Sequence, residues 1–377
     1  MTAAGVQKIA FRTDASLLMG SGHVMRCLTL ADALTTRGAQ CHFISRAHPG
    51  HMLELIRQRG FAVTALPAEP PPQLGHNPTA NGHLKEPVHA PWLGYDWQSD
   101  ARQTCAILAK LQPDWLVVDH YALEQRWEST LQPNFQQLMV IDDLADRPHQ
   151  CDLLLDQNLG CLPQDYVGLV PAHCTVLTGS QYALLRPEFA ALRAYSLQRR
   201  QQTLLKQVLI TMGGVDWPNA TSQVLQALMG CTLPQDCSIS VVMGLQAPWL
   251  QQVQARAKDM PWPTEVLVNI SDMAQRMADS DLAIGAAGST SWERCCLGLP
   301  TLLVVLAENQ KNSAQALHEA QAALLIGDVS DIATKLPLAI SASASHHRRH
   351  EISTATAAVT DGRGVGKVLQ AMRVLND

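Results

Sequence analysis

A short stretch near the start of the chain combines residue types that can hold an anion and move a proton. Gly20, Ser21 and Gly22 follow an apolar run and precede a segment with helical apolar spacing, and His23 comes next. Glycine lets the backbone turn sharply and approach a ligand, and the first N–H groups of a helix lack partners within it. We therefore expect Gly20 and Gly22 to bind an anion such as a phosphate group. Glycine required only for packing of the turn is the alternative.

His23 is the candidate general base of this loop. It falls in the first turn of the expected helix, where the helix dipole disfavours a protonated imidazole. The ordinary pKa of histidine, about 6.5, is already close to neutral pH. We therefore expect an uncharged ring that accepts a proton from water. A surface histidine that caps the turn is the alternative.

Arg12 and Asp14 flank the end of the first apolar run. We take Arg12 as a candidate substrate contact and Asp14 as a candidate catalytic residue. Other roles stay open, because the two side chains could pair with each other and only brace the loop. Asp14 could also orient His23 or hydrogen-bond a sugar hydroxyl.

Polar residues also follow two later apolar runs. Asp119 and Tyr121 end the run "WLVVDHY", where side chains usually line a ligand site, although Asp119 could simply cap the following helix. Tyr121 is the favoured substrate contact of this run. Asp142 and Asp143 end another apolar run, but they lack the ligand spacing that is typical of a metal centre. We expect no metal and no cofactor.

Three segments in the second half of the chain could bind a nucleotide. Gly213, Gly214 and Asp216 lie in "TMGGVD" after an apolar run, where glycines could admit a diphosphate to the backbone or could form an ordinary turn.

In "GAAGSTSWERC", Ser289 precedes Glu293 by about one helical turn. Thr290 and Glu293 match a capping box, but the carboxylate could equally accept both hydroxyls of a ribose. Asn309 and Gln310 follow the last strong apolar run, where amides can bond a phosphate or a sugar.

The elements that must position these residues form a repeating pattern. Short apolar runs alternate with helical periodicity, which is typical of βαβ units and parallel sheets. We predict an α/β protein of two Rossmann-like lobes that face a central cleft, with ligands at the carboxyl ends of the strands. The predicted divisions are 1–190 for the N-terminal lobe with the histidine loop, 191–340 for the C-terminal lobe and 341–377 for a helical tail. The expected strands are 8–13, 41–46, 61–66, 115–120, 138–143, 151–156, 207–214, 238–244, 265–269, 282–288 and 300–306.

One long connection interrupts the first lobe. Residues 67–98 are rich in Pro, Gly, Asn and His and cannot form a regular element. Their second half contains "WLGYDW", whose aromatic residues predict that this part docks on the lobe. The first half looks expendable.

Composition excludes several function classes. The 377 residues carry a net charge of -5, so a surface for duplex nucleic acid is not expected. The ten cysteines are scattered without CxxC pairs, which favours a reducing cytoplasm over a disulfide scaffold. The first residues do not read as a secretory signal, and no apolar stretch is long enough to span a membrane. We expect a cytoplasmic monomer or weak homo-oligomer.

The opening motif "FRTDASLLMGSGHVMRC" closely resembles the signature Arg-x-Asp-x-Ser-x-x-x-Gly-x-Gly-His-x-x-Arg of a known family. These are the UDP-2,4-diacetamido-2,4,6-trideoxy-beta-L-altropyranose hydrolases of pseudaminic acid biosynthesis. Supporting segments follow in the order of that family over roughly residues 8–325: "WLGYDWQSDA", "LVVDHYAL", "IDDLADRPHQCDLLLDQNLG", "GSQYALLRPEF", "ITMGGVD" and "STSWERCCLGLPTLLVVLAENQ". The chain departs from the family in the Pro-rich insert at 68–90 and in the tail after about residue 340.

The resemblance implies a GT-B-like fold and a hydrolase of nucleotide-sugar metabolism that serves flagellin glycosylation. Water attacks the anomeric carbon of a UDP-linked 2,4-diacetamido-2,4,6-trideoxy sugar with inversion and releases UDP, without a metal ion. The resemblance gives His23 as the base and Tyr121 as an assisting residue. It also implies that the UDP-sugar contacts are Arg186, Gly213, Gly214, Ser289, Glu293 and Asn309. A GT-B glycosyltransferase with a UDP-sugar donor and a non-catalytic nucleotide-sugar binding protein are the alternatives.

Overall fold

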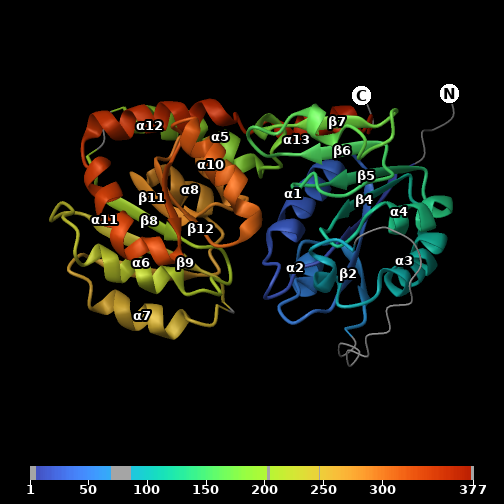
Figure 1. Ribbon diagram of the computed structural model, residues 1–377, viewed down its shortest axis with the longest axis horizontal. Coiled ribbons are helices and arrows are strands. Elements are labelled where there is room, and N and C mark those ends of the chain that lie inside the picture. Colours follow the sequence, from blue (N-terminus) through green and yellow to red (C-terminus); the bar gives the residue numbers. More distant parts are fainter. Residues whose placement is uncertain (1–5, 69–85, 202–203, 246, 375–377) are drawn as a thin grey trace. The chain divides into compact units, whose positions relative to one another are not determined.

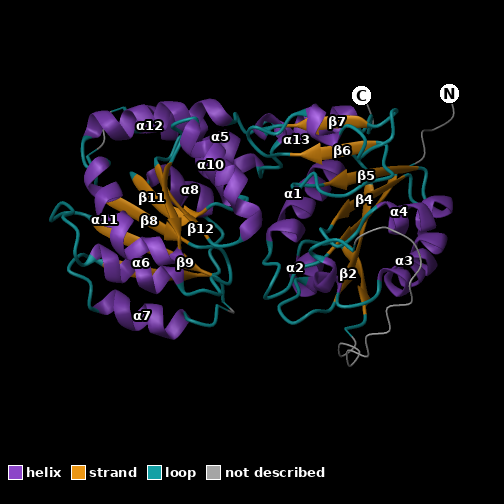
Figure 2. Ribbon diagram, in the orientation of Figure 1, coloured by secondary structure: helices purple, strands orange, loops and turns teal. Residues whose placement is uncertain are grey.

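The computed structural model describes residues 6–68, 86–201, 204–245 and 247–374 (Figure 1). The chain divides into two compact units. The first unit comprises Met1–Gln157, Cys161–Thr178 and Val365–Asp377, and the second comprises Asn158–Gly160 and Gly179–Gly364. Each unit is built on one parallel sheet covered by helices (Figure 2).

The observed division differs from the boundaries expected from the sequence. The helix Pro187–Arg199 belongs to the second unit because Phe189 is buried in its core and Arg193 donates hydrogen bonds to the carbonyls of Cys296 and Ala357. The expected tail is divided as well. Its helix His346–Val359 lies in the second unit, and the chain then returns to the first unit at Val365.

In the first unit, the described residues form a seven-stranded sheet in the order β3-β2-β1-β4-β5-β6-β7. Its strands are β1 (Lys8–Thr13), β2 (Gln40–Arg46), β3 (Ala62–Leu66), β4 (Trp115–Asp119), β5 (Gln137–Ile141), β6 (Leu153–Asp156) and β7 (Thr175–Thr178). Its helices are α1 (Gly22–Thr36), α2 (Leu53–Gln58), α3 (Trp97–Leu111), α4 (Gln125–Leu131) and α13 (Gly364–Ala371). The chain proceeds from β1 to one side and returns to the other side at β4, so the strand order reverses between β1 and β4. Ligands of open α/β sheets bind at such a switch point, at the carboxyl ends of the strands.

The second unit repeats this plan with a six-stranded sheet over the described residues, in the order β10-β9-β8-β11-β12-β13. Its strands are β8 (Gln207–Thr211), β9 (Ser238–Met243), β10 (Thr264–Val268), β11 (Leu282–Ala286), β12 (Thr301–Val305) and β13 (Leu324–Asp328). Its helices are α5 (Pro187–Arg199), α6 (Ala220–Leu228), α7 (Leu250–Lys258), α8 (Met273–Asp279), α9 (Thr290–Cys296), α10 (Lys311–Glu319), α11 (Ile332–Ala342) and α12 (His346–Val359). Here the order reverses between β8 and β11.

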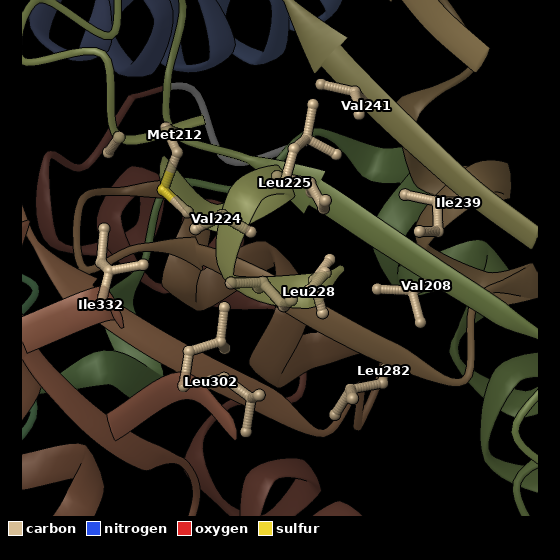
Figure 3. Close-up of a cluster of buried hydrophobic side chains, with 14 of the residues drawn as sticks. Val208, Met212, Val224, Leu225, Leu228, Ile239, Val241, Leu282, Leu302 and Ile332 are labelled. Carbon is tan, nitrogen blue, oxygen red and sulfur yellow. The ribbon is translucent and has the colours of Figure 1, made fainter. Parts of the chain in front are cut away.

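In the second unit, apolar side chains of the strands pack against helices on both faces of the sheet. Val208 and Ile210 of β8 pack with residues of α6, α7 and α11, whereas Leu209 packs on the other face with residues of α5, α8, α9 and α10. This follows from the two-residue period of a strand, which turns successive side chains to opposite faces. Figure 3 shows the first of these clusters, in which Leu225 and Leu228 of α6 face the strands.

Most expected elements are confirmed, and two strands were missed. Gly38, with φ of +86°, follows the end of α1 as expected for a residue after a helix C-terminus. The sequence did not predict β7 and β13, which are edge strands. β7 has only four residues, and β13 contains Gly327, beside which its pairing with β12 shifts register. Within the described ranges, no helix has the length and hydropathy needed to cross a bilayer.

A buried carboxylate joins four elements of the first unit. Asp100 of α3 accepts hydrogen bonds from Arg12 of β1 at 2.7 Å, from Arg46 of β2 at 2.5 Å and from the indole of Trp127 of α4 at 2.9 Å. Asp100, Arg12 and Arg46 are completely buried. Removing one member of such a cluster leaves charges buried without compensation, which is far more costly than losing an exposed pair.

We therefore expect Asp100→Asn to lower the free energy of unfolding by about 3 to 5 kcal/mol. Urea unfolding followed by circular dichroism measures this loss. Glu54→Gln is the control, because it breaks the exposed pair between Glu54 and Arg57 and should change little. A loss for Asp100→Asn as small as that of the control would show that the cluster does not hold the unit together.

Candidate active site

His23 lies in the first turn of α1, at the switch point of the first sheet. Its Nδ1 is 2.6 Å from Oδ1 of Asp119, the last residue of β4. A carboxylate only accepts hydrogen bonds, so we assign the proton of the neutral ring to Nδ1, which leaves the lone pair of Nε2 free. The side chain of His23 is 8% exposed. Asp119 therefore fixes the orientation of the His23 ring.

Arg26 holds the carboxylate that orients His23. Its Nε donates to Oδ2 of Asp119 at 2.6 Å and its Nη2 to Oδ1 at 2.7 Å, the two-pronged geometry of a strong pair. Burial opposes ionisation of Asp119, but the charge of Arg26 outweighs it and lowers the pKa of this carboxyl well below its ordinary value. Arg26 is one helical turn beyond His23, so both side chains leave the same face of α1. The sequence predicted no role for Arg26.

Tyr121 contacts His23 and is tied to the same network. Its hydroxyl donates to Oδ2 of Asp143 at 2.5 Å, and Nη1 of Arg26 donates to the same oxygen at 2.6 Å. Its ring meets that of His23 edge to face, with 4.5 Å between centroids. Burial and the charge of Asp143 raise the pKa of Tyr121 well above its ordinary value, so it remains a neutral phenol. Arg26 thus links the partner of His23 to the partner of Tyr121.

Asp14, a candidate catalytic residue from the sequence, does not contact His23. Its carboxylate accepts from Nη1 of Arg12 at 2.6 Å and from the backbone N–H of Arg46 at 2.7 Å, and it is 3.3 Å from Nε2 of His120. Of the open alternatives, the structure supports the one in which Asp14 and Arg12 brace the loop. Asp119 takes the orienting role.

Two further expectations for this region need correction. Arg12, a candidate substrate contact, is completely buried, and its guanidinium is bonded to Asp14 and Asp100. Asp119 does not cap the following helix, because the N-cap of α4 is Glu124.

The loop before His23 uses the amide of Gly20 within its own turn and leaves the start of α1 without a side-chain cap. Gly20 has φ of +75°, a conformation that favours glycine, and its N–H donates to the carbonyl of Ser16 at 2.8 Å. Gly22 begins α1, and the N-cap residue Ser21 makes no side-chain cap hydrogen bond. The first amides of α1 therefore have no side-chain cap that would compete with an anion.

The aromatic stretch that was expected to dock does so. The guanidinium of Arg46 lies 4.0 Å from the ring centroid of Tyr95. Gly94 has φ of +71°, and a Cβ there would come within 2.8 Å of the ring of His48. Asp96 caps α3 by accepting from the N–H of Ser99 at 2.7 Å. The preceding residues 69–85, which include most of the half predicted to be expendable, lie outside the described residues.

In the second unit, the glycines of "TMGGVD" lie at the carboxyl end of β8. Gly213 has φ of +86°, and an added Cβ would meet nothing within 4 Å. The carbonyl of Gly214 accepts from the N–H of Gly244 at 3.1 Å, so the loop after β9 packs directly on this turn. A Cβ at Gly244 would lie 2.1 Å from that carbonyl oxygen, so the position requires glycine. The sequence did not single out Gly244.

Asp216 is corrected from a substrate contact to a helix cap. It is 4% exposed, and its two carboxylate oxygens accept from the N–H groups of Ala220 and Thr221, each at 2.9 Å. Both oxygens are therefore occupied at the start of α6.

Glu293 and Arg186 come together although they are far apart in sequence. Nη2 of Arg186 is 3.6 Å from Oε1 of Glu293, and its Nη1 is 2.9 Å from Oε1 of Glu188. The capping box expected as the simpler role of Glu293 is not formed, because the N-cap of α9 is Ser289 and makes no side-chain cap hydrogen bond. Burial raises the pKa of Glu293 to about 7, and the charge of Arg186 opposes this only in part.

Gln310 and Arg294 surround the loop between β11 and α9. Oε1 of Gln310 accepts from the N–H of Leu306 at 3.0 Å, and its Nε2 would lie 3.6 Å from a Cβ at Gly288. Asn309 is half-buried in the same turn. Arg294 is buried and donates to the carbonyl of Ala286 at 2.6 Å, and burial lowers its pKa to about 10. No carboxylate of the described chain forms a salt bridge with it, so this loop carries a positive charge that favours an anion.

A metal centre finds no support in the part of the chain that the structure describes. No group of three or more His, Cys, Asp or Glu side chains there could hold an ion. Asp142 is instead paired with Arg147 at 2.9 Å and accepts from the hydroxyl of Tyr166 at 3.0 Å.

Comparisons with known proteins identify a family and related sequences. The family model described as the glycosyltransferase family 28 C-terminal domain matches residues 173–364. The chain is 26% identical over 308 residues, covering 81% of this chain and 94% of the relative, to the UDP-2,4-diacetamido-2,4,6-trideoxy-beta-L-altropyranose hydrolase of Campylobacter jejuni. It is 24% identical over 307 residues to an uncharacterised protein of Methanocaldococcus jannaschii, covering 80% of this chain but only 56% of that longer protein.

A solved structure shows the same fold. The crystal structure of Acinetobacter baumannii MurG matches with a TM-score of 0.69 at 16% identity, covering 98% of this chain and all of that chain. The predicted α/β fold class, two Rossmann-like lobes of the GT-B type with parallel sheets, is confirmed.

The raised pKa of Glu293 predicts a specific dependence of stability on pH. The folded state holds the proton more tightly than the unfolded chain, so this stability is fully present below about pH 4.5 and is lost as the pH rises through about 7. Glu293→Gln stays neutral at every pH. We expect the wild type to lose about 2 kcal/mol of unfolding free energy relative to this variant between pH 5 and pH 8.

Urea unfolding at the two pH values measures this difference. Glu188→Gln removes the other carboxylate partner of Arg186 and controls for the loss of negative charge beside that guanidinium. Parallel pH profiles for the wild type and Glu293→Gln would contradict the prediction.

Proposed function

Because the chain belongs to the family defined by the glycosyltransferase family 28 C-terminal domain, we propose that it acts on a UDP-sugar and that it transfers the sugar to water. The substrate we propose is a UDP-linked 2,4-diacetamido-2,4,6-trideoxy sugar. The named relative from Campylobacter jejuni supports this choice over most of its own length.

The pairing of His23 with Asp119 carries the proposal. With Nδ1 bonded to the carboxylate, Nε2 is the nitrogen that accepts a proton from a water molecule. The water oxygen forms a bond to the anomeric carbon, and its proton goes to Nε2. The bond from that carbon to the phosphate oxygen breaks, and UDP leaves with the electron pair. Attack opposite to the leaving group inverts the anomeric centre.

UDP is a good leaving group once its charge is stabilised, so the reaction needs little help from a general acid. Tyr121 is a neutral phenol beside the ring of His23 and assists in positioning the water or the sugar. We propose that Gly22 presents its amide to the anionic part of the substrate in the first unit. Gly20 shapes the turn instead, because its N–H already donates to the carbonyl of Ser16. No metal or other cofactor enters this proposal.

The second unit is proposed to bind the nucleotide. Glu293 and Arg186 are partly exposed, at 17% and 19% of their side chains. Arg186 is the N-cap residue of α5, but its side chain makes no cap hydrogen bond, and Glu293 does not cap α9. A carboxylate can accept hydrogen bonds from both ribose hydroxyls. We further propose that Gly213, Gly214, Ser289, Asn309 and Gln310 line the same edge of the second sheet and contact the diphosphate or ribose.

We propose that the enzyme acts in the cytoplasm, in pseudaminic acid biosynthesis. We further propose that it is a monomer or weak homo-oligomer that binds no nucleic acid or membrane. All ten cysteines lie in the described residues and are free thiols, which supports a reducing compartment.

Transfer of the sugar to an acceptor alcohol is the second candidate function, and the match to a glycosyltransferase family favours it. Incubation of the protein with the UDP-sugar in the presence of EDTA and without any acceptor separates the two. Steady release of UDP and of the free sugar supports hydrolysis. UDP release that occurs only after an acceptor is added supports transfer.

We expect His23→Asn to lower kcat by about 10² to 10⁴, the usual contribution of a general base. The affinity for UDP should stay within about twofold of the wild type, because the substitution lies in the first unit. Initial rates of UDP release and calorimetric titration with UDP measure the two effects. His51→Asn, at an exposed histidine of the same unit, is the control and should retain full activity. Unchanged turnover in His23→Asn would remove His23 as the base.

Glu293→Ala is expected to weaken UDP binding by about tenfold to a hundredfold, since a hydrogen bond to a charged group contributes about 1.5 to 3 kcal/mol. The measurement is the rise in Tm on addition of UDP at pH 8, where the carboxylate is ionised. Glu188→Ala should respond to UDP like the wild type. If Glu293→Ala is stabilised by UDP as much as the wild type, Glu293 does not contact the nucleotide.

A further inference from the structure

Two aromatic rings for which the sequence predicted no role lie around His23. Trp92 belongs to the short helix Ala90–Leu93, and its ring centroid is 6.5 Å from that of His23. Trp92 also stacks on Tyr121, with 5.8 Å between centroids and 27° between ring planes. The ring centroid of His89 is 4.6 Å from that of Trp92 and 5.4 Å from that of Tyr121. The three rings and His23 form one cluster, which we call the aromatic wall.

The members of the aromatic wall differ in exposure. As whole residues, His23 and Tyr121 are 7% and 4% exposed, whereas Trp92 and His89 are half-buried. Trp92 and His89 therefore provide most of the accessible ring surface near His23. The segment that carries them packs on the lobe at Gly94, where an added Cβ would come within 2.8 Å of the ring of His48.

The reaction geometry brings the sugar to this surface. A water activated by Nε2 lies about 3 Å from that atom. The anomeric carbon that it attacks lies about 3 to 3.5 Å further on. The sugar substituents then extend to about the distance that separates His23 from Trp92. An indole face contributes apolar contact area and binds methyl groups better than hydroxyl groups, which lose their hydration there.

We propose that Trp92 and His89 bind the methyl groups of the sugar, namely those of the acetamido groups and of C6, and so select N-acetylated 6-deoxy sugars over fully hydroxylated ones. This inference rests on the proposed function, because it takes the sugar of a UDP-sugar to lie beside His23. A ring that only covered Tyr121 would have no preference among sugars.

Saturation-transfer NMR tests the contact without turnover. The probe is UDP-2,4-diacetamido-2,4,6-trideoxy-beta-L-altropyranose, and the protein carries His23→Asn so that the probe is not consumed. We expect strong transfer to the sugar methyl protons. Adding Trp92→Ala should reduce the methyl signals at least twofold while the uracil signals stay unchanged, and Trp92→Phe should restore them. Trp97→Ala, at a tryptophan of the same segment that packs on Arg126, is the matched control.

Affinity provides the second measurement. The His23→Asn protein should bind this probe more tightly than UDP-glucose, which has no methyl group, and adding Trp92→Ala should reduce that preference by about tenfold. An unchanged preference, or methyl signals independent of Trp92 with the Tm unchanged, overturns the inference and leaves the hydrolase proposal standing. Methyl signals that depend on Trp92 in a protein that releases no UDP without an acceptor support the inference and overturn hydrolysis.

Discussion

The two-pronged bond between Arg26 and Asp119 is the interaction on which the candidate active site depends. It keeps the carboxylate ionised in a place where burial alone would favour protonation. An ionised carboxylate can only accept, and this decides which nitrogen of His23 carries the proton. Because Arg26 also holds Asp143, the partner of Tyr121, one guanidinium orients both groups beside the proposed reaction centre.

The balance between burial and ion pairing shifts the pKa of carboxyl groups in opposite directions in the two units. In the first unit, Asp119 and Asp100 each have a guanidinium nitrogen within 2.7 Å, and their pKa values are lowered. In the second unit, Arg186 stays 3.6 Å from Glu293, so burial prevails and the pKa rises. A short ion pair fixes the position of a side chain, whereas a loosely paired carboxylate keeps the capacity to accept further hydrogen bonds.

Topology explains why the two groups of candidate site residues lie where they do. In each sheet the strand order reverses between two central strands, β1 and β4 in the first unit and β8 and β11 in the second. The loops at that point diverge to opposite sides, which leaves the strand ends accessible to a ligand. Strands buried on both faces make these positions rigid, so that short loops can hold side chains precisely.

The sequence by itself determined the α/β class, most strands, the helix that follows Gly22 and the docking of the aromatic stretch, because these depend on local periodicity and on residue types that act near their own position. Only the tertiary structure decided which carboxylate serves His23. Asp14 is close in sequence, but its carboxylate accepts hydrogen bonds from Arg12 and Arg46. Asp119 is 96 residues away from His23. It lies near His23 because β4 pairs with β1, which places Asp119 opposite Thr13. A parallel sheet joins strands that are distant in the chain, and no local pattern records which strand ends become neighbours.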